Sequence, residues 1–212
     1  MPPTYFVAVA GNIGVGKSTL TELMSARLGW EPVYEAVDEN PYLSDFYADM
    51  ERWSFHSQAF FLARRLRQHA ALQHLGRSVV QDRSVYEDAE IFAHNLYRQG
   101  HMSARDWATY FDLYQSLVAL LRPPDLVVYL RAQVGTLAAR IGGRGRAYEQ
   151  AVPTAYLEAL NRRYDEWIGS FTLCPVLTVE TDNLNYVSDS ASLEKVIRRI
   201  QDRLHGKETL TL

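Results

Sequence analysis

The sequence predicts an α/β fold, in which a doubly wound, five-stranded parallel sheet is flanked by helices. Short apolar runs rich in Val and Ile recur between helix-patterned stretches, with little of the polar alternation of a half-exposed sheet. Such runs are typical of strands buried on both faces. A glycine-rich stretch also connects the first apolar run to a helix-like segment, in the strand–loop–helix order of a P-loop. Together these observations favour a P-loop α/β domain.

The composition indicates one soluble domain that spans residues 1–212. Of the 212 residues, 47% are hydrophobic and 22% are charged, which is ordinary for a globular protein. The net charge of −3 gives no reason to expect a nucleic-acid polymer or an anionic membrane as partner. The lone cysteine, Cys174, excludes an intramolecular disulfide and a cysteine-based zinc site. Because we see no signal-peptide pattern and no membrane-spanning apolar run, we expect a cytoplasmic protein.

The five expected strands are residues 5–10, Pro32–Glu35, Ser78–Asp82, Asp125–Leu130 and Pro175–Glu180. In a doubly wound sheet, ligands bind at the carboxyl ends of the strands. Each of the first three strands ends in residues that can do chemistry, namely the glycine-rich loop, Glu35 and Asp82-Arg83. We therefore expect the site at this edge.

The first of these features is GNIGVGKS, which matches the pattern G-x-x-x-x-G-K-[ST] from Gly11 to Ser18. Its backbone N–H groups and the positive end of the following helix are expected to surround phosphate oxygens. Lys17 would reach the β- and γ-phosphates, and the Ser18 hydroxyl would ligate Mg²⁺. The predicted ATP-binding residues here are Gly11, Asn12, Ile13, Gly14, Val15, Gly16, Lys17, Ser18 and Thr19.

The longest helical pattern runs from Glu51 to Leu75. Its expected packed face, from the three- and four-residue spacing of apolar positions, consists of Phe55, Ala59, Leu62, Leu66 and Ala70. Gln58 and Arg65 are two turns apart and share another face, where the pattern alone favours a solvated Arg65. Further helices are expected at Met102–Leu121, Pro153–Phe171 and about Ser192–Leu204.

A cationic segment follows the fourth strand, where Arg140, Arg144 and Arg146 are separated by glycines. The glycines are expected to break the helix at 142–143 and to allow motion. In a P-loop protein such a segment indicates a lid over about 140–150 that closes on transferring phosphates. A plain basic surface loop is the alternative.

Phosphoryl transfer to an alcohol needs charge neutralisation, positioning and a base for the attacking hydroxyl. Glu35 faces the loop across the expected cleft and is the candidate base, with Asp38 and Glu39 behind it. Asp82 is the candidate for the Mg²⁺ shell, and Arg83 would pair with Glu35 or with the reacting oxygen. The two acids could exchange roles, and Asp82-Arg83-Ser84 could be a plain strand end and helix N-cap.

In this order, the motifs resemble the deoxynucleoside kinase family over roughly residues 5–190. The matching stretches are GNIGVGKS, YEAVDENPYL (34–43), ERWSFHSQ (51–58), DRSVYED (82–88), RGRAYEQ (144–150) and TDNLNY (181–186). Many nucleotide hydrolases share the P-loop alone, but the combination is specific to this family.

The resemblance implies a role for each matching residue. Glu35 would be the general base for the 5′-hydroxyl, held by Arg83, and Asp82 takes the place of a glutamate. Gln58 would hydrogen-bond the base edge. Further implied roles are those of Tyr47 and Glu149 at the sugar 3′-hydroxyl, and of Arg140, Arg144 and Arg146 at the donor phosphates. The family pattern Glu-Pro is Glu35-Ala36 here, and the shorter Asp82 could reach a metal through water.

The same resemblance implies a base preference. Arg65 and Asp88 match an arginine–carboxylate pair of members that accept purines and cytosine. Because an ionised carboxylate only accepts hydrogen bonds, it favours the amino groups of adenine and cytosine. We predict deoxyadenosine first and deoxycytidine second, with deoxyguanosine as the main alternative.

Two other functions compete with this one. A thymidylate-kinase-like nucleoside monophosphate kinase shares the P-loop and lid but needs extra cations for a second phosphate. A P-loop switch without catalysis would not need a base, a metal ligand and lid arginines together. Family members are usually homodimers. The helix Trp107–Leu121 and the helix that carries Ile91, Phe92 and Leu96 are expected to form such a face, with ordinary core as the alternative for the same residues. Donor adenine contacts are expected from the backbone around Asp182–Asn185.

Overall fold

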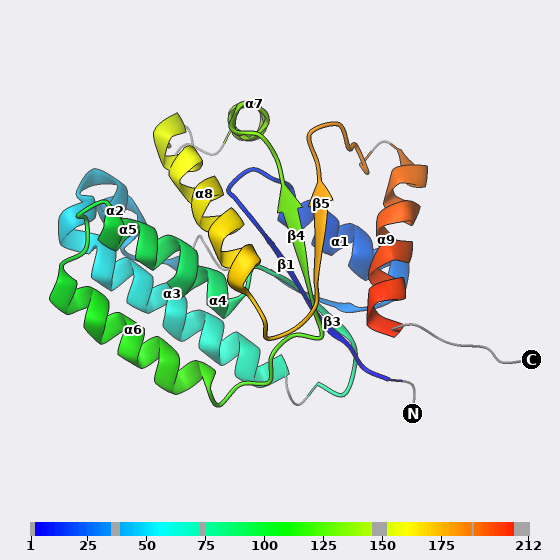
Figure 1. Cartoon of the computed structure of the whole chain (residues 1–212), viewed down its shortest axis with the longest axis horizontal. Helices are drawn as coiled ribbons and strands as arrows, with labels where there is room; N and C mark the ends of the chain where they lie inside the picture. The colour runs from blue at the N-terminus through cyan, green and yellow to red at the C-terminus, as the bar shows by residue number, and fades with distance from the viewer. Residues whose placement is uncertain (1–2, 35–38, 73–74, 146–151, 188, 206–212) are drawn as a thin grey trace, which may run out of the picture.

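The computed structural model describes residues 3–34, 39–72, 75–145, 152–187 and 189–205. It contains a five-stranded sheet with the strand order β2-β3-β1-β4-β5, in which every neighbouring pair is parallel (Figure 1). The strands are β1 (Phe6–Gly11), β2 (Glu31–Val33), β3 (Val79–Asp82), β4 (Leu126–Arg131) and β5 (Val176–Glu180). The predicted fold class and all five strands are therefore confirmed, with bounds shifted by one or two residues.

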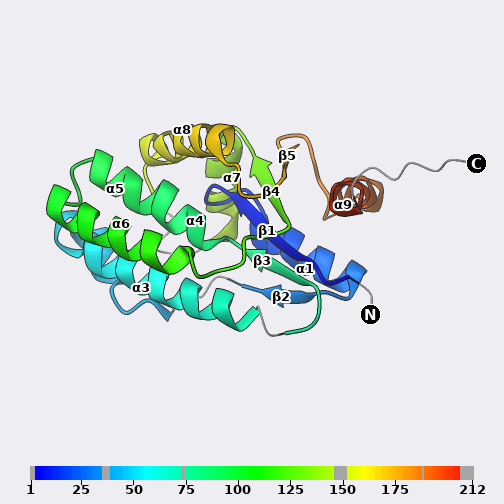
Figure 2. The ribbon, with the colours of Figure 1, turned by 60° about the horizontal axis from the view of Figure 1, so that its bottom comes forward.

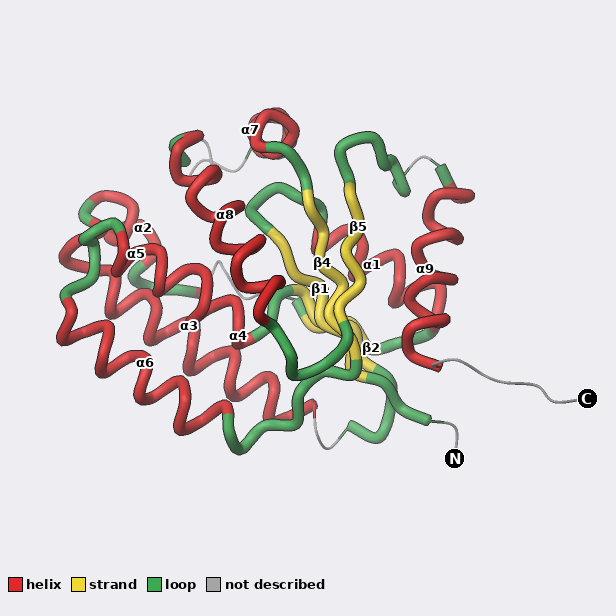
Figure 3. The backbone as a smooth tube through the Cα atoms, viewed as in Figure 1, coloured by secondary structure: helices red, strands yellow, loops and turns green. Residues whose placement is uncertain are grey.

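Helices connect the strands and lie on both sides of the sheet (Figure 3). None of the helices in the described ranges is long and apolar enough to cross a membrane. The helical elements are α1 (Lys17–Leu28), α2 (Leu43–Ala48), α3 (Met50–Leu72), α4 (Val85–Glu87), the π-helical turn η2 (Asp88–Ala93), α5 (His94–Arg98), α6 (Ala104–Val118), α7 (Val134–Arg144), α8 (Thr154–Ser170) and α9 (Ser190–His205).

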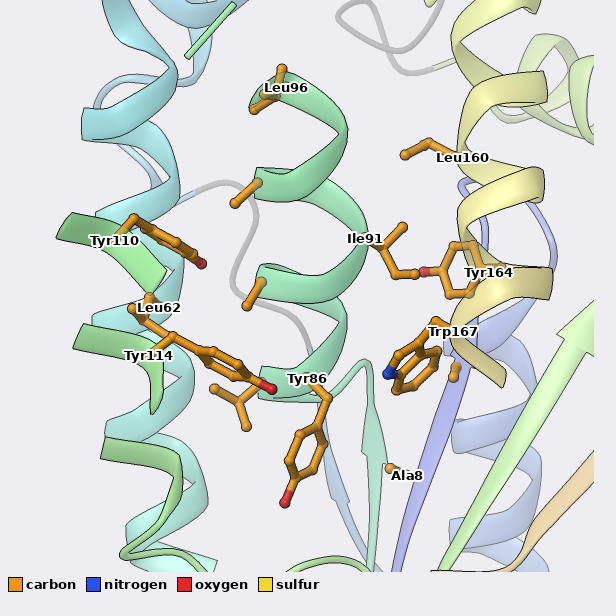
Figure 4. Packing of buried hydrophobic residues seen from close by; sticks show 14 of the residues in the cluster. Ala8, Leu62, Tyr86, Ile91, Leu96, Tyr110, Tyr114, Leu160, Tyr164 and Trp167 are labelled. Carbon is orange, nitrogen blue, oxygen red and sulfur yellow. The ribbon is translucent and has the colours of Figure 1, made fainter. Parts of the chain in front are cut away.

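The two faces of the sheet have different cores. On the side of α1, α7 and α9 lies an aliphatic core, whose buried members include Val9, Leu20, Val128, Leu137 and Ile200. On the side of α3 to α6 and α8 lies an aromatic core, whose buried members include Tyr86, Tyr110, Tyr114, Tyr164 and Trp167. Figure 2 shows α1 and α9 on one side of the sheet and α3 to α6 and α8 on the other, and Figure 4 shows the aromatic side chains converging on the helical stretch that carries Ile91.

The packed face predicted for α3 is only partly correct. Leu62 is buried, but Ala70 is exposed, and the buried face is mainly polar. Its buried residues are Ser54, Ser57, Gln58, Leu62, Arg65 and His69. Gln58 and Arg65 do share a face, as predicted. Arg65 is only 2% exposed, however, so the solvated surface position favoured by the helical pattern is wrong.

Two further expectations are corrected. Helix α7 continues through Gly142 and Gly143 and ends at Arg144, followed by Gly145 with a left-handed φ of 73°. Arg140 and Arg144 therefore lie one turn apart on an intact helix. Ile91 and Leu96, which we expected at a dimer face, have no exposed surface and belong to the aromatic core.

Candidate active site

The loop between β1 and α1 has the backbone geometry that its glycines predict. Gly16 lies just before α1 with φ of 105°, and a Cβ there would lie 2.6 Å from the Tyr186 hydroxyl. A Cβ on Gly11, where φ is 145°, would lie 2.5 Å from the Leu130 carbonyl oxygen. Any larger residue would therefore be strained and would clash at both positions. The Lys17 ammonium donates to the Asn12 carbonyl oxygen at 3.1 Å, so the lysine lies along the loop.

Asn12 fixes this loop to α8. Its Nδ2 donates to the Leu157 carbonyl oxygen at 2.9 Å and to Asn161 Oδ1 at 2.7 Å, and its Oδ1 accepts from the Ile13 N–H at 2.7 Å. Since the side chain is 2% exposed, Asn12 holds the loop in place from within the protein. The sequence indicated Asn12 only as part of the phosphate-binding motif.

A cavity of about 640 Å³ lies beside the loop, between it and residues 182–187, with Arg140 and Arg144 in its wall. Arg140 donates to the carbonyl oxygens of Val15 at 3.1 Å and Thr181 at 2.6 Å. Arg140 therefore links the glycine-rich loop to the segment that follows β5.

The segment that follows β5 is held at α7 by Asp182. Its carboxylate accepts from the Thr136 hydroxyl at 2.6 Å and from the Gln133 N–H at 2.9 Å. These hydrogen bonds hold the pKa of Asp182 below its usual value. The segment predicted to contact the donor base thus lies at the wall of the cavity, with its first residue fixed.

Ser18 and Asp82 form the candidate metal site. The Ser18 hydroxyl donates to Asp82 Oδ2 at 2.5 Å, while Asp82 Oδ1 is buried and has no hydrogen-bond partner among the described residues. A hydroxyl and a carboxylate are hard oxygen ligands that suit Mg²⁺, and phosphate oxygens and water usually complete its shell. In the described ranges no group of three His, Cys, Asp or Glu residues could hold a metal without such help.

Arg83 follows β3 with φ of 67°, the only non-glycine residue with positive φ in the described ranges. Its Nη1 donates to the Tyr164 hydroxyl at 3.0 Å, and its guanidinium lies 4.3 Å from the centre of the Phe92 ring. The Tyr164 hydroxyl donates to Glu87 Oε1 at 2.8 Å. Ser84 is the N-cap of α4, as the alternative interpretation predicted, so the end of β3, Arg83 and the start of α4 occupy one short segment.

The acceptor side is built from α3 and η2. Arg65 Nε donates to Asp88 Oδ2 at 3.1 Å, and Arg65 Nη1 donates to the Asp82 carbonyl oxygen at 3.2 Å. Both side chains of the pair are at most 4% exposed, and Gln58 is buried on the same face of α3. The predicted Arg65–Asp88 pair is therefore present, and its arginine contacts the backbone of Asp82, the candidate metal ligand.

Of the remaining predicted residues, some lie in the described ranges and others do not. Tyr47, in α2, is half-buried against the aromatic core. Glu39 forms an ion pair with Arg64 at 2.7 Å, on the outer side of α3. Four predicted residues lie outside the described residues, namely Glu35, Asp38, Arg146 and Glu149.

Sequence reasoning missed Glu87 and Tyr164, which contact Arg83. A signal for Glu87 was present, because Ser84-x-x-Glu87 has the spacing of a helix capping box. Tyr164 carried no comparable signal, since it is one of many aromatic residues in an amphipathic helix and comes close to Arg83 only in the folded chain.

Comparison with known proteins agrees with this geometry. A profile of the deoxynucleoside kinase family matches residues 7–205. The deoxyadenosine/deoxycytidine kinase of Bacillus subtilis (strain 168) is 39% identical over 210 residues, which cover 98% of this chain and 97% of that protein. A deoxyguanosine kinase of Lactobacillus acidophilus is 35% identical, with 93% of this chain and 90% of that protein covered.

The solved structure of M. mycoides deoxyadenosine kinase with bound dATP is similar in fold, with a TM-score of 0.82 and 30% identity. The match covers 93% of this chain and 99% of that one. The P-loop, the polar face of α3 and the segment after β3 thus occur in a chain that is related over nearly its whole length. This protein belongs to the deoxynucleoside kinase family.

Proposed function

We propose that this kinase transfers the γ-phosphoryl group of ATP to the 5′-hydroxyl of deoxyadenosine, with deoxycytidine as second substrate. The observation that carries the base preference is the buried Asp88 carboxylate beside Arg65. The guanidinium favours the ionised carboxylate, which can only accept hydrogen bonds. Adenine and cytosine offer an amino group to such an acceptor, whereas thymine and guanine offer a carbonyl oxygen in the corresponding place.

A deoxyguanosine kinase is the second candidate. The relatives include deoxyguanosine kinases at up to 35% identity, so the overall similarity does not separate the two activities. A carboxylate would accept the N1–H of guanine after a shift of the base. A thymidylate-kinase-like activity has less support, because a second acceptor phosphate would meet the acidic residues proposed for the acceptor side.

On the donor side, the loop Gly11–Thr19 and Lys17 would bind the ATP phosphates, with Arg140, Arg144 and Arg146 above them as a lid over about 140–150. Ser18 and Asp82 would hold Mg²⁺, which neutralises charge on the phosphates when it is bound. The support is the buried Asp82 oxygen without a hydrogen-bond partner among the described residues, next to the first residues of α1. ATP itself is the phosphoryl donor.

On the acceptor side, Glu35 would take the proton from the 5′-hydroxyl, and Arg83 would orient that hydroxyl. Gln58 would hydrogen-bond the base, and Tyr47 with Glu149 would bind the sugar 3′-hydroxyl. A site built around a hydroxyl rejects analogues that lack it, so 2′,3′-dideoxynucleosides should be poor substrates.

We also infer a single domain over residues 1–212 that forms a homodimer in the cytoplasm. Exposed Leu113, Leu117 and Leu120 on and just after α6 support a contact between copies, because they form an apolar strip on an otherwise polar helix face. Cys174 as the lone cysteine suits a reducing compartment.

Steady-state kcat/KM with ATP and each of the four deoxynucleosides tests the proposal. Deoxyadenosine should give the highest value and deoxycytidine the second. Deoxyguanosine as best substrate would establish the second candidate, and phosphorylation of dAMP without phosphorylation of deoxyadenosine would establish a monophosphate kinase.

A further inference from the structure

Glu87 is a fully buried carboxylate to which the proposed reaction gives no task. It lies at the end of α4, one helical turn after Arg83, and its side chain has no exposed surface. Leaving a carboxylate inside a protein is costly unless donors and an opposite charge surround it. The groups that contact the Glu87 carboxylate therefore indicate its role.

Three segments of the chain donate to this carboxylate. The Gly11 N–H at the end of β1 donates to Oε1 at 3.2 Å, and the Ser84 N–H donates to Oε2 at 2.8 Å. The Tyr164 hydroxyl of α8 donates to Oε1 at 2.8 Å. The two backbone bonds fix the position of Glu87 between the glycine-rich loop and the start of α4, so the tyrosine meets an acceptor that cannot move.

Tyr164 connects Glu87 to Arg83 through two hydrogen bonds. A phenol has one proton, and since Tyr164 donates it to Glu87, the hydroxyl oxygen accepts from Arg83 Nη1 at 3.0 Å. Glu87 Oε1 itself lies 3.7 Å from Arg83 Nη1. Figure 4 shows the Tyr164 ring reaching from α8 toward the helical stretch that follows Arg83. The negative charge and the tyrosine together fix one edge of the guanidinium.

The arginine requires such support. Its φ of 67° is unfavourable for a non-glycine residue. The Arg83 N–H donates to the Val9 carbonyl oxygen at 3.0 Å, and Phe92 lies under the guanidinium. Contacts from β1, η2, α4 and α8 therefore hold Arg83 in this strained backbone conformation and fix the direction of its side chain.

We propose that Glu87 is a positioning residue, which orients Arg83 toward the acceptor hydroxyl through Tyr164. The inference rests on the proposed role of Arg83 in phosphoryl transfer. Small misplacements of a catalytic side chain cost up to about a hundredfold in rate. Glu87→Gln keeps the size of the side chain but removes its charge and turns one acceptor into a donor.

The test is a double-mutant cycle in kcat with deoxyadenosine and ATP. Glu87→Gln should lower kcat about tenfold to a hundredfold, with the KM for ATP changed by less than about threefold. In an Arg83→Lys background the same change should cause less than about a twofold further loss, because the aligned guanidinium is already gone. An equal loss in both backgrounds, or an unchanged kcat in Glu87→Gln, would overturn the proposal.

Tyr164→Phe provides a second variant, which removes the bridge and leaves the backbone bonds of Glu87 intact. It should also lower kcat and be non-additive with Arg83→Lys. Tyr129→Phe is the matched control, because Tyr129 is 2% exposed, stacks on Tyr164 with ring centres 5.6 Å apart, and directs its hydroxyl to Asp165. Tyr129→Phe should keep the wild-type kcat, and a loss equal to that of Tyr164→Phe would indicate a packing role instead. An inactive wild-type enzyme would refute the proposed function itself, whereas an active one that tolerates Glu87→Gln refutes only the positioning role.

Discussion

The two faces of the sheet differ in what their cores are made of. The aliphatic core under α1, α7 and α9 consists almost entirely of Val, Leu, Ile, Ala and Met, with Tyr186 as its buried aromatic member. The aromatic core under α3 to α6 and α8 contains tyrosines whose hydroxyls lie close to buried charges. Aliphatic side chains stabilise the fold by packing, which is not directional. Tyrosines fill space as well, and their hydroxyls also place hydrogen-bonding groups.

This difference matches the two halves of the proposed site. The donor side uses backbone N–H groups, which a loop and a helix start can present on a plain apolar support. The acceptor side places the buried Gln58, Arg65 and Asp88 side chains from α3 and η2, so its core carries polar groups of its own. The polar buried face of α3 belongs to this second requirement.

The largest expected effect comes from breaking the buried ion pair of the aromatic side. Arg65→Leu would leave Asp88 charged and buried, at a cost of about 3–5 kcal/mol in the free energy of unfolding at neutral pH. Urea denaturation measures this. The matched control is Arg64→Leu, which breaks an exposed pair with Glu39 and should cost less than about 1 kcal/mol. Equal losses in the two variants would contradict the buried pair.

A change in the aliphatic core should affect stability alone. Ile200→Ala in α9 removes a fully buried side chain and should lower the free energy of unfolding by about 2–5 kcal/mol. At temperatures where the variant stays folded, kcat/KM for deoxyadenosine should equal that of the wild type. Arg198→Ala, on the exposed face of the same helix, should change stability by less than about 0.5 kcal/mol. A changed base preference in Ile200→Ala would show that the two faces are not separate.

The smallest effect concerns pH. Burial lowers the pKa of His69, whose Nε2 donates to the Arg122 carbonyl oxygen at 2.7 Å. Nδ1 has no hydrogen-bond partner in the described part of the chain. The unfolded chain therefore binds a proton near pH 6.5 while the folded protein does not, so stability is present above this pH and falls below it.

The slope from this histidine is at most about 1.4 kcal/mol per pH unit, or one proton. His69→Gln keeps an N–H donor and cannot titrate, so the free energy of unfolding should depend less on pH below about pH 6.5. Denaturation at several pH values checks this. An unchanged slope in His69→Gln would refute the assignment to His69.

The sequence was informative where function lies in consecutive residues. The strand runs, the glycine pattern at Gly11–Ser18 and the order of the family motifs led to the fold and to the Arg65–Asp88 pair. Periodicity failed for α3, because apolar spacing does not reveal that a polar face is buried. The break predicted from the glycines at 142–143 was also wrong, because each glycine lowers helix propensity by only about 1 kcal/mol and the helix continues.

Contacts between distant segments were beyond a single sequence. Tyr164 meets Arg83 and Glu87 only because α8 packs on the segment after β3, and nothing in the local pattern marks this. The same holds for Asn12, whose side chain contacts α8 residues far along the chain.

The base preference of Asp88→Asn tests most directly whether the aromatic side selects the substrate. An asparagine presents both a carbonyl oxygen and an amide N–H, so it would no longer repel the guanine carbonyl. The ratio of kcat/KM for deoxyadenosine to that for deoxyguanosine should be well above one in the wild type and should fall by at least about tenfold in the variant, the value of one hydrogen-bonding mismatch of roughly 1.4 kcal/mol. A ratio that stays the same in Asp88→Asn, or that already favours deoxyguanosine in the wild type, would contradict the account.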